Sequence, residues 1–156
     1  MNVNDKSLII LMADDDEDDC LLAKKALEQS GLTARLKFVK DGEELIDYLC
    51  GEGDHEYESE FPKPDIILLD LNMPKMNGLE ALKAIKSHSE LCHIPVIILT
   101  TSKADHDICD SYAFGASSFI TKPASFNGLV ETMEIIKKYW FEVVELPKKH
   151  SVWGGN

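Results

Sequence analysis

Four short apolar segments of this chain each end at a polar residue suited to phosphate or metal chemistry. The segments and their polar residues are 8–13 with Asp14 and Asp15, 66–69 with Asp70, 96–99 with Thr100, and 119–121 with Lys122. Short apolar runs bounded by polar or turn residues are typical of buried parallel strands. In an open α/β sheet, ligands bind in the crevice outside the carboxyl ends of the strands. We therefore expect three carboxylates, a hydroxyl and an ammonium to meet at one edge of a sheet.

Helical patterns separate these segments, and 35–39 alternates like a half-exposed edge strand. The expected helices are 17–30, about 42–51, one containing Leu79, Leu82 and Ile85, 105–114, and 125–139. Strand and helix thus alternate five times, which predicts a doubly wound, five-stranded parallel sheet with helices on both faces. The 156 residues suffice for one domain with a modest tail. Residues 51–64 form an acidic loop longer than usual, and 139–147 alternate enough for a short added strand or arm.

Composition excludes several classes of function. The formal net charge of −12 opposes nucleic-acid binding. No apolar stretch approaches the roughly 20 residues of a membrane span, and residues 1–7 lack the apolar core of a secretory signal. Four scattered cysteines without C-x-x-C spacing suit a reducing cytosol. We expect a cytoplasmic protein without structural zinc, because the Cys92-His93 pair has no second pair to complete a site.

The carboxylates predict a divalent cation site. Asp14, Asp15 and Asp70 supply hard oxygen ligands, and Mg²⁺ typically takes one or two carboxylates together with waters and phosphate oxygens. Without a metal the carboxylates repel, so at least one should have a raised pKa. Lys122 adds a point charge for a phosphoryl oxygen, and Thr100 adds a hydroxyl donor. A nucleophile, charge neutralisation and alignment are what phosphoryl transfer requires.

The chain resembles the receiver domain of two-component response regulators over residues 8 to about 139. Three motifs carry the resemblance in chain order: Asp14-Asp15, then Asp70-Leu71-Asn72-Met73-Pro74 followed by Gly78, then Thr100 ahead of Lys122-Pro123. Each motif alone is weak, but all of them in this order are specific. The resemblance implies a flavodoxin-like sheet with strand order 2-1-3-4-5. It also implies a signalling switch, not a turnover enzyme, that receives a phosphoryl group from a sensor histidine kinase.

The same resemblance assigns the acceptor and the metal ligands. Asp70 is the expected phosphoacceptor, attacking the phosphohistidine of the kinase. Mg²⁺ is expected to bind Asp15 directly, Asp14 largely through water, Asp70, and the backbone carbonyl of Asn72.

Further residues are expected to respond to the phosphoryl group on Asp70. Lys122 pairs with the acceptor before transfer and with the phosphoryl group afterwards, when Thr100 moves to bond that group. Phe119 matches an aromatic position, often Tyr in the family, that turns inward into the space Thr100 leaves. The bond to Pro123 is typically cis in the family, so a cis bond is expected here. Thr101 stands where the family usually has Ala, Gly or Ser, and its extra methyl is expected to hinder the hydrolytic water.

The loop before the third expected strand and the 139–147 tail are similar to the small stand-alone regulators that partner bacterial phytochromes. We therefore expect a 1–7 tail, a receiver domain over 8–139 and an extension over 140–156 without an effector domain. The implied partners are a sensor histidine kinase, for which the resemblance suggests the phytochrome type, and an unknown downstream protein. A homodimer through the face carrying the fourth and fifth strands and their helices is also expected.

Two other classes share single features with this chain. The Asp70-Leu71-Asn72 sequence is similar to the D-x-D motif of haloacid-dehalogenase phosphatases, but Asn72 replaces the general acid. A flavodoxin-like FMN binder needs a Ser/Thr/Gly phosphate loop after the first strand, and here that loop is acidic. An EF-hand is excluded by spacing. The acids of 16–19 are interpreted as a solvated face that complements the helix dipole.

Overall fold

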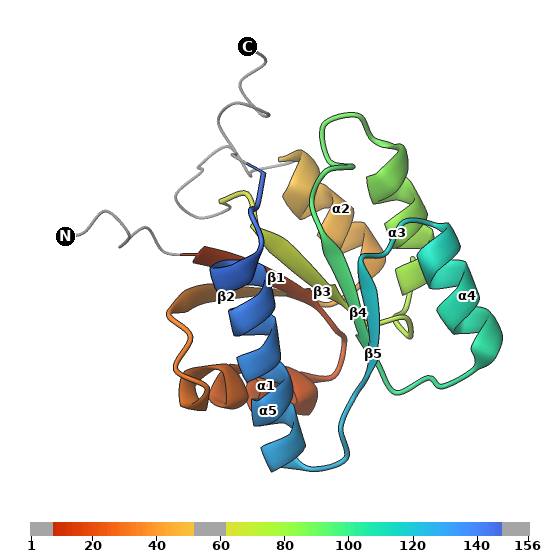
Figure 1. Ribbon diagram of the computed structural model, residues 1–156. Coiled ribbons are helices and arrows are strands. Elements are labelled where there is room, and N and C mark those ends of the chain that lie inside the picture. The colour runs from red at the N-terminus through yellow and green to blue at the C-terminus, as the bar shows by residue number, and fades with distance from the viewer. Residues whose placement is uncertain (1–7, 52–61, 148–156) are drawn as a thin grey trace.

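The computed structural model describes residues 8–51 and 62–147, which fold around a five-stranded parallel sheet (Figure 1). The strands are β1 (Leu8–Ala13), β2 (Ala34–Val39), β3 (Ile66–Leu69), β4 (Val96–Thr100) and β5 (Ser118–Thr121). The helices are α1 (Glu17–Gln29), α2 (Gly42–Cys50), α3 (Gly78–Ser87), α4 (Asp105–Ala113), α5 (Phe126–Ile136) and the π-helix η2 (Lys137–Val143). The strand order is β2-β1-β3-β4-β5, so the predicted fold class and topology are confirmed.

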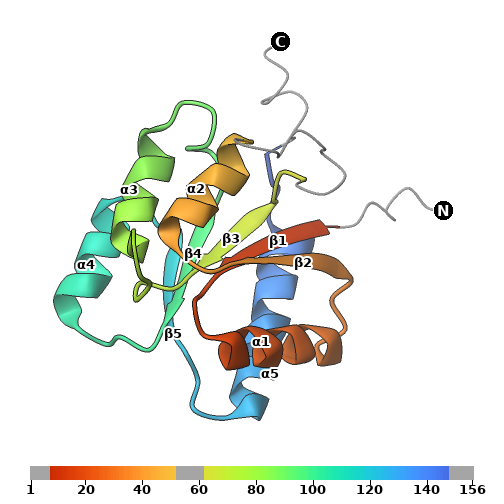
Figure 2. The same ribbon diagram turned by 180° about the vertical axis from the view of Figure 1, so that it is seen from behind.

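Helices cover both faces of the sheet. Figures 1 and 2 show α1 and α5 on one face and α2, α3 and α4 on the other. Each face has its own apolar cluster, one built with α1 and α5 and the other with α2 and α3. We call these the α1–α5 face and the α2–α4 face.

Alternation of side chains along the strands assigns each residue to one of these faces. In β1, Ile10 and Met12 pack in the cluster of the α1–α5 face, whereas Leu11 and Ala13 pack in that of the α2–α4 face. The three central strands are buried on both sides, which explains their continuous apolar sequences. Strand β2 lies at the edge and is only partly buried, as its alternating pattern predicted.

Polar side chains fix where the helices begin. Asp16 caps α1 by accepting from the amides of Asp18 and Asp19, and Asp41 accepts from the amide of Glu44 at the start of α2. Such side chains satisfy the free N–H groups of a first helical turn. Because Asp16 caps α1, this helix begins close to the carboxyl end of β1.

The segment after α5 differs from the predicted strand or arm. The helix continues without a break as η2, and the Val144 amide donates to the carbonyl of Tyr139 five residues earlier, at 3.0 Å. Trp140 and Phe141 both pack against the α1–α5 cluster, which consecutive residues of a strand cannot do on one face. Burial of Trp140 and Phe141 in a helix therefore outweighs the weak alternation of polar and apolar residues in the sequence. The expected domain boundary at 139 falls inside η2.

Several expectations concern residues outside the described ranges: the 1–7 tail, most of the 51–64 loop, and the end of the 140–156 extension. Within 8–51 and 62–147, no helix combines the length and apolar character needed to cross a membrane. All four cysteines are free thiols.

Candidate phosphoacceptor and metal site

The sheet's backbone holds the site residues one position beyond the regular strands. The amide of Asp14 donates to the carbonyl of Val39 in β2 at 3.0 Å, and the amide of Asp70 donates to Ala13 in β1 at 3.0 Å. The amide of Lys122 donates to the carbonyl of the last β4 residue at 2.7 Å. These bonds extend the ladders past the strand ends, so three functional side chains start from fixed backbone.

Strand alternation then divides the site residues between the two faces. Asp14 and Asp70 continue the rows that pack on the α1–α5 face, and Lys122 continues the row of Ile120. Thr100 continues the opposite row, on the α2–α4 face, where Phe119 also packs. The carboxylates and the ammonium therefore face helix α1, whereas the hydroxyl approaches from the other side.

The ammonium of Lys122 contacts three carboxylates. Its Nζ lies 2.7 Å from Asp14 Oδ2, 2.7 Å from Asp19 Oδ2 and 3.3 Å from Asp70 Oδ2. An ammonium has three N–H donors, so these contacts use all of them. The side chains of Asp14 and Asp70 are 1% and 9% exposed, whereas that of Asp19 is 35% exposed.

The Asp70 carboxylate is held from several directions. The hydroxyl of Thr100 donates to its Oδ1 at 2.7 Å, and the amide of Asn72 donates to the same oxygen at 3.3 Å. Gly78 lies so close behind that a Cβ there would overlap the carbonyl oxygen of Asp70. The loop after β3 thus depends on a residue without a side chain at position 78.

Burial and charge shift two pKa values in the site. Burial raises the pKa of the Asp14 carboxyl, although hydrogen bonds from Lys122 and the Asp16 amide oppose this change. Burial alone would lower the pKa of Lys122, but its hydrogen bonds to Asp14 and Asp19 outweigh that effect and raise it. The lysine therefore stays charged at neutral pH. The expected raised carboxyl pKa is found at Asp14, but its largest cause is burial, and repulsion by Asp70 contributes less.

The carboxylates fit a divalent cation. Asp14, Asp15 and Asp70 each offer an oxygen within 4.8 Å of the others, and Asp15 is exposed. Hard carboxylate oxygens at a site open to water on one side match the preference of Mg²⁺ for a few protein ligands completed by waters or phosphate oxygens. The predicted trio is thus brought together, with Asn72 adjoining it through its bond to Asp70.

Three other predicted residues lie around this centre. Phe119 is half-buried and packs against the α2–α4 cluster, and Thr101 is exposed directly after Thr100. The expected cis bond before Pro123 is absent, because every peptide bond among the described residues is trans. Trans is the intrinsically favoured isomer by about 0.5–1 kcal/mol, and with it the Lys122 amide and ammonium reach all the partners described above.

Asp19 was missed by the sequence interpretation, which treated 16–19 as a solvated face. The sequence nevertheless contains a helical pattern that could have identified Asp19. The buried residues of α1 are Ala23, Ala26 and Leu27, and Asp19 lies four residues before Ala23, so it continues the inward stripe of the helix. The run of acids concealed that one member faces the sheet.

Fold and site together define a receiver domain, and comparison with known proteins agrees. Residues 10–134 match the family model described as the response regulator receiver domain. The chain therefore belongs to the response regulator receiver family, a family of signalling proteins in which phosphoryl acceptance from a histidine kinase is the standard role.

Individual proteins of this family are similar to the chain over most of its length. The chain is 39% identical to the probable methanogenesis regulatory protein FilR2 of Methanothrix harundinacea, covering 85% of this chain and 83% of the relative. It is 36% identical to the response regulator Rcp1 of Synechocystis, covering 89% and 92%. The structure of the phosphorylated cyanobacterial phytochrome response regulator RcpA superposes with a TM-score of 0.83 at 36% identity, covering 91% and 99%. A structure of Rcp1 is of its Mn²⁺-bound form, with a TM-score of 0.81 at 33% identity, covering 90% of this chain and 99% of that one.

Proposed function

We propose that Asp70 is the phosphoacceptor of this chain and that a sensor histidine kinase is its donor. In the transfer, a carboxylate oxygen of Asp70 forms a bond to phosphorus while the bond from phosphorus to the donor's imidazole nitrogen breaks. The imidazole leaves with that electron pair. The observation that carries the proposal is the convergence of Thr100 and Lys122 on one nearly buried carboxylate beside two further acids.

Mg²⁺ is the proposed cofactor. Asp14, Asp15, Asp70 and the backbone carbonyl of Asn72 would hold it, and when bound it would neutralise charge on the phosphoryl oxygens. Lys122 supplies a second cation, which contacts Oδ2 of Asp70 at 3.3 Å. The protein's own contribution is alignment, because the sheet's backbone and the α3 loop fix the acceptor in place.

Thr100 and Phe119 are the proposed readers of phosphorylation. Both belong to the α2–α4 face, on the neighbouring strands β4 and β5. Thr100 is the last residue of β4, whereas the half-buried Phe119 pairs with Ile98, two residues earlier in that strand. A movement of Thr100 toward the phosphoryl group would open space on the side where Phe119 packs. The added charge would thus alter the surface formed by α4 and β5, where a downstream protein can detect it.

A phosphorylated switch fits these residues better than a turnover phosphatase. Asn72 cannot act as the general acid that a leaving group needs, and the proposed role of the Thr101 methyl group is to hinder the attacking water. We infer a signalling element that keeps its phosphoryl group, and we propose a phytochrome-type kinase as donor because of the likeness to Rcp1 and RcpA.

Labelling with a small phosphodonor tests the acceptor. Incubation with Mg²⁺ and acetyl phosphate should add one phosphoryl group, observed by mass spectrometry of the intact protein. The variant Asp70→Asn should not be labelled, and omission of Mg²⁺ should prevent labelling of the natural protein. Normal labelling of the Asn variant would show that Asp70 is not the acceptor.

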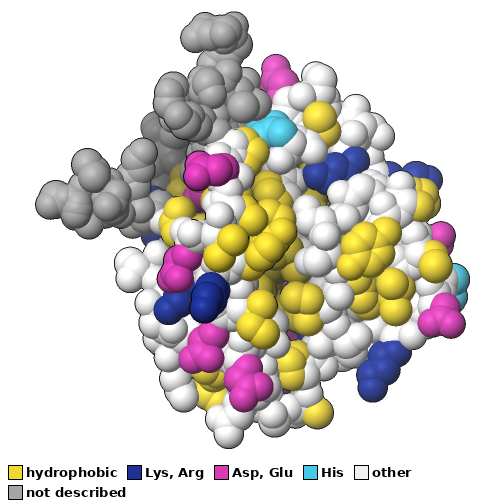
Figure 3. Space-filling model, in the orientation of Figure 1, with side chains coloured by type: hydrophobic (Ala, Val, Ile, Leu, Met, Phe, Trp, Pro, Cys, Tyr) yellow, Lys and Arg dark blue, Asp and Glu magenta, His cyan; other side chains and the backbone are white. Residues whose placement is uncertain are grey.

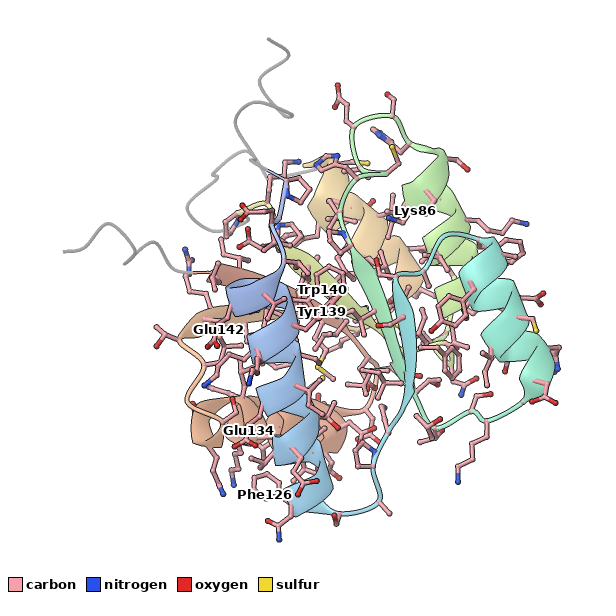
Figure 4. The ribbon with its side chains drawn as sticks, viewed as in Figure 1. Lys86, Phe126, Glu134, Tyr139, Trp140 and Glu142 are labelled. Atoms are coloured by element: carbon pink, nitrogen blue, oxygen red, sulfur yellow. The ribbon has the colours of Figure 1, made fainter. Side chains whose placement is uncertain are left out.

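We also propose a homodimer through the face formed by α4, β5 and α5. Ile135, Tyr139 and Val143 follow one another at four-residue spacing and are 67%, 50% and 63% exposed, and Tyr112 of α4 is also exposed. Figure 3 shows hydrophobic side chains gathered on this side of the molecule. Figure 4 places Glu134 and Glu142 on one side of the last helix and Tyr139 on the other. Contiguous exposed apolar side chains of this kind mark protein interfaces.

Sedimentation measurements test the dimer. Ile135→Asp should convert a dimer to a monomer, because it would bury a charge within the row of exposed apolar side chains formed by Ile135, Tyr139 and Val143. Leu21→Asp, at a similarly exposed apolar position of α1, is the matched control and should leave the dimer intact. A natural protein that sediments as a monomer with and without phosphorylation would contradict the proposal.

A further inference from the structure

We propose that Asp19 is a positioning residue that restrains Lys122, and that this restraint sets the balance between metal binding and phosphoryl-group binding at Asp70. The inference rests on the proposed function and extends it to a residue outside the acceptor and its metal ligands. It starts from one contact, the 2.7 Å bond from Lys122 Nζ to Asp19 Oδ2.

The geometry makes Asp19 a competitor for the ammonium. Lys122 lies 2.7 Å from Asp19 but 3.3 Å from Asp70, so its charge is held nearer to helix α1 than to the acceptor. Asp19 is itself held in place, because it lies in the first turn of α1 and its amide donates to the capping carboxylate of Asp16 at 3.2 Å. The first turn of α1 therefore restrains the side chain of Lys122.

Asp19 also differs from the other two partners in what it can bind. Asp14 and Asp70 belong to the trio whose oxygens approach one another closely enough to hold a metal ion, and Asp19 does not. A cation between the trio and Lys122 would compete for the same carboxylates. Asp19 gives the ammonium a partner that the metal does not use, so it should favour metal binding.

The effect on a phosphoryl group should have the opposite sign. A phosphoryl group on Asp70 needs Lys122 as a counter-ion, and Asp19 withholds part of that charge. Asp19 also adds a negative charge near an anionic group.

Asp19 and Lys122 also line a cavity of about 90 Å³ whose wall is mostly apolar. The pair is therefore reachable from the side of α1 and of the segment between β5 and α5.

Two titrations of the full chain test the proposal. Mg²⁺ affinity is measured by calorimetry, and affinity for beryllofluoride, a stable mimic of the phosphoryl group, by fluorine NMR at saturating Mg²⁺. In Asp19→Asn we expect Mg²⁺ to bind about threefold to tenfold more weakly and beryllofluoride to bind more tightly by a similar factor, as loss of one charge-assisted bond predicts. A merely structural role would weaken both ligands together.

Matched variants separate the contact from the charge. Asp18→Asn removes the same charge from the same helical turn, but Asp18 is exposed and its neighbour makes the contact, so both affinities should stay close to those of the natural protein. Asp19→Glu keeps the carboxylate and should restore part of the natural balance. Equal behaviour of the two Asn variants, or a shift of both affinities in one direction, would overturn the inference.

A metal-free measurement gives an independent readout. The ammonium hydrogens of Lys122 should exchange slowly in the natural protein, because three carboxylates hold them and the side chain is 12% exposed. NMR of the lysine ammonium group should show faster exchange in Asp19→Asn than in Asp18→Asn. If the natural protein binds beryllofluoride no better than Asp70→Asn does, the proposed function fails and this inference with it; if it binds normally and only the Asp19 variants disagree, the inference alone fails.

Discussion

The hydroxyl of Thr100 donates to the carboxylate of Asp70 at 2.7 Å, although the two side chains come from opposite rows of neighbouring strands. Both residues are buried, at 0% and 6% exposure. Thr100→Val keeps the shape of the side chain and removes the donor. We expect the free energy of unfolding to fall by about 1–3 kcal/mol, because a buried carboxylate loses a hydrogen bond. Urea denaturation of the metal-free protein measures this change.

Thr100→Ser is the control for that experiment, because it retains the hydroxyl and loses only a methyl group. The serine variant should be more stable than the valine variant. The reverse order of stability would show that burial of the methyl group, and not the bond to Asp70, is what matters at this position.

Gly78→Ala should disturb the acceptor through the backbone. A Cβ at this position would overlap the carbonyl oxygen of Asp70 and crowd the α-carbon of Leu71. Backbone has to move to relieve such contacts, so we expect a loss of about 1–3 kcal/mol in stability together with slower labelling by acetyl phosphate. Ser87→Ala, at the exposed end of the same helix, should change neither quantity.

Much of this arrangement could be predicted from sequence because it depends on local patterns. The apolar runs predicted the strands, and their end residues predicted which side chains would meet, since parallel strands share one edge. Asp14, Asp15, Asp70, Thr100 and Lys122 all follow from that rule.

Two features depend on packing as well as on the local pattern. The helical spacing that groups Asp19 with Ala23 is present in the sequence, but the packing of α1 on the sheet decides that this face, and not the rest of the acidic run, turns inward. The residues after 139 alternate weakly, and packing of Trp140 and Phe141 against the α1–α5 cluster decides in favour of a helix. Tertiary packing thus selected among local options in both cases.

Thr101→Ala should shorten the lifetime of the phosphoryl group. Thr101 is exposed and directly follows Thr100, whose hydroxyl contacts Asp70. We propose that the Thr101 methyl group hinders the attacking water. Removing the side chain beyond Cβ would remove that hindrance, and we expect dephosphorylation to become about threefold to tenfold faster, a barrier change of about 0.7–1.4 kcal/mol. Decay of the labelled protein after removal of phosphodonor measures the rate. An unchanged rate would remove Thr101 from any role in lifetime.

Tyr48 should make stability depend on pH in the alkaline range. Burial raises the pKa of Tyr48 to about 12, with the charge of Arg35 opposing, and its hydroxyl donates to the carbonyl of Pro62 at 2.9 Å. In the unfolded chain a tyrosine titrates near pH 10. The unfolded state therefore releases its proton first, and the free energy of unfolding should fall as the pH rises from about 10 to 12.

Comparison with Tyr48→Phe isolates this contribution. The variant lacks the hydroxyl, so the difference in unfolding free energy between the natural protein and the variant should shrink over that pH range and stay constant below it. Ultraviolet absorbance of phenolate should also show one late-titrating tyrosine that the variant loses. Tyr112→Phe is the control, because Tyr112 is 50% exposed. A constant difference in stability between natural protein and Tyr48→Phe across the alkaline range would contradict the raised pKa.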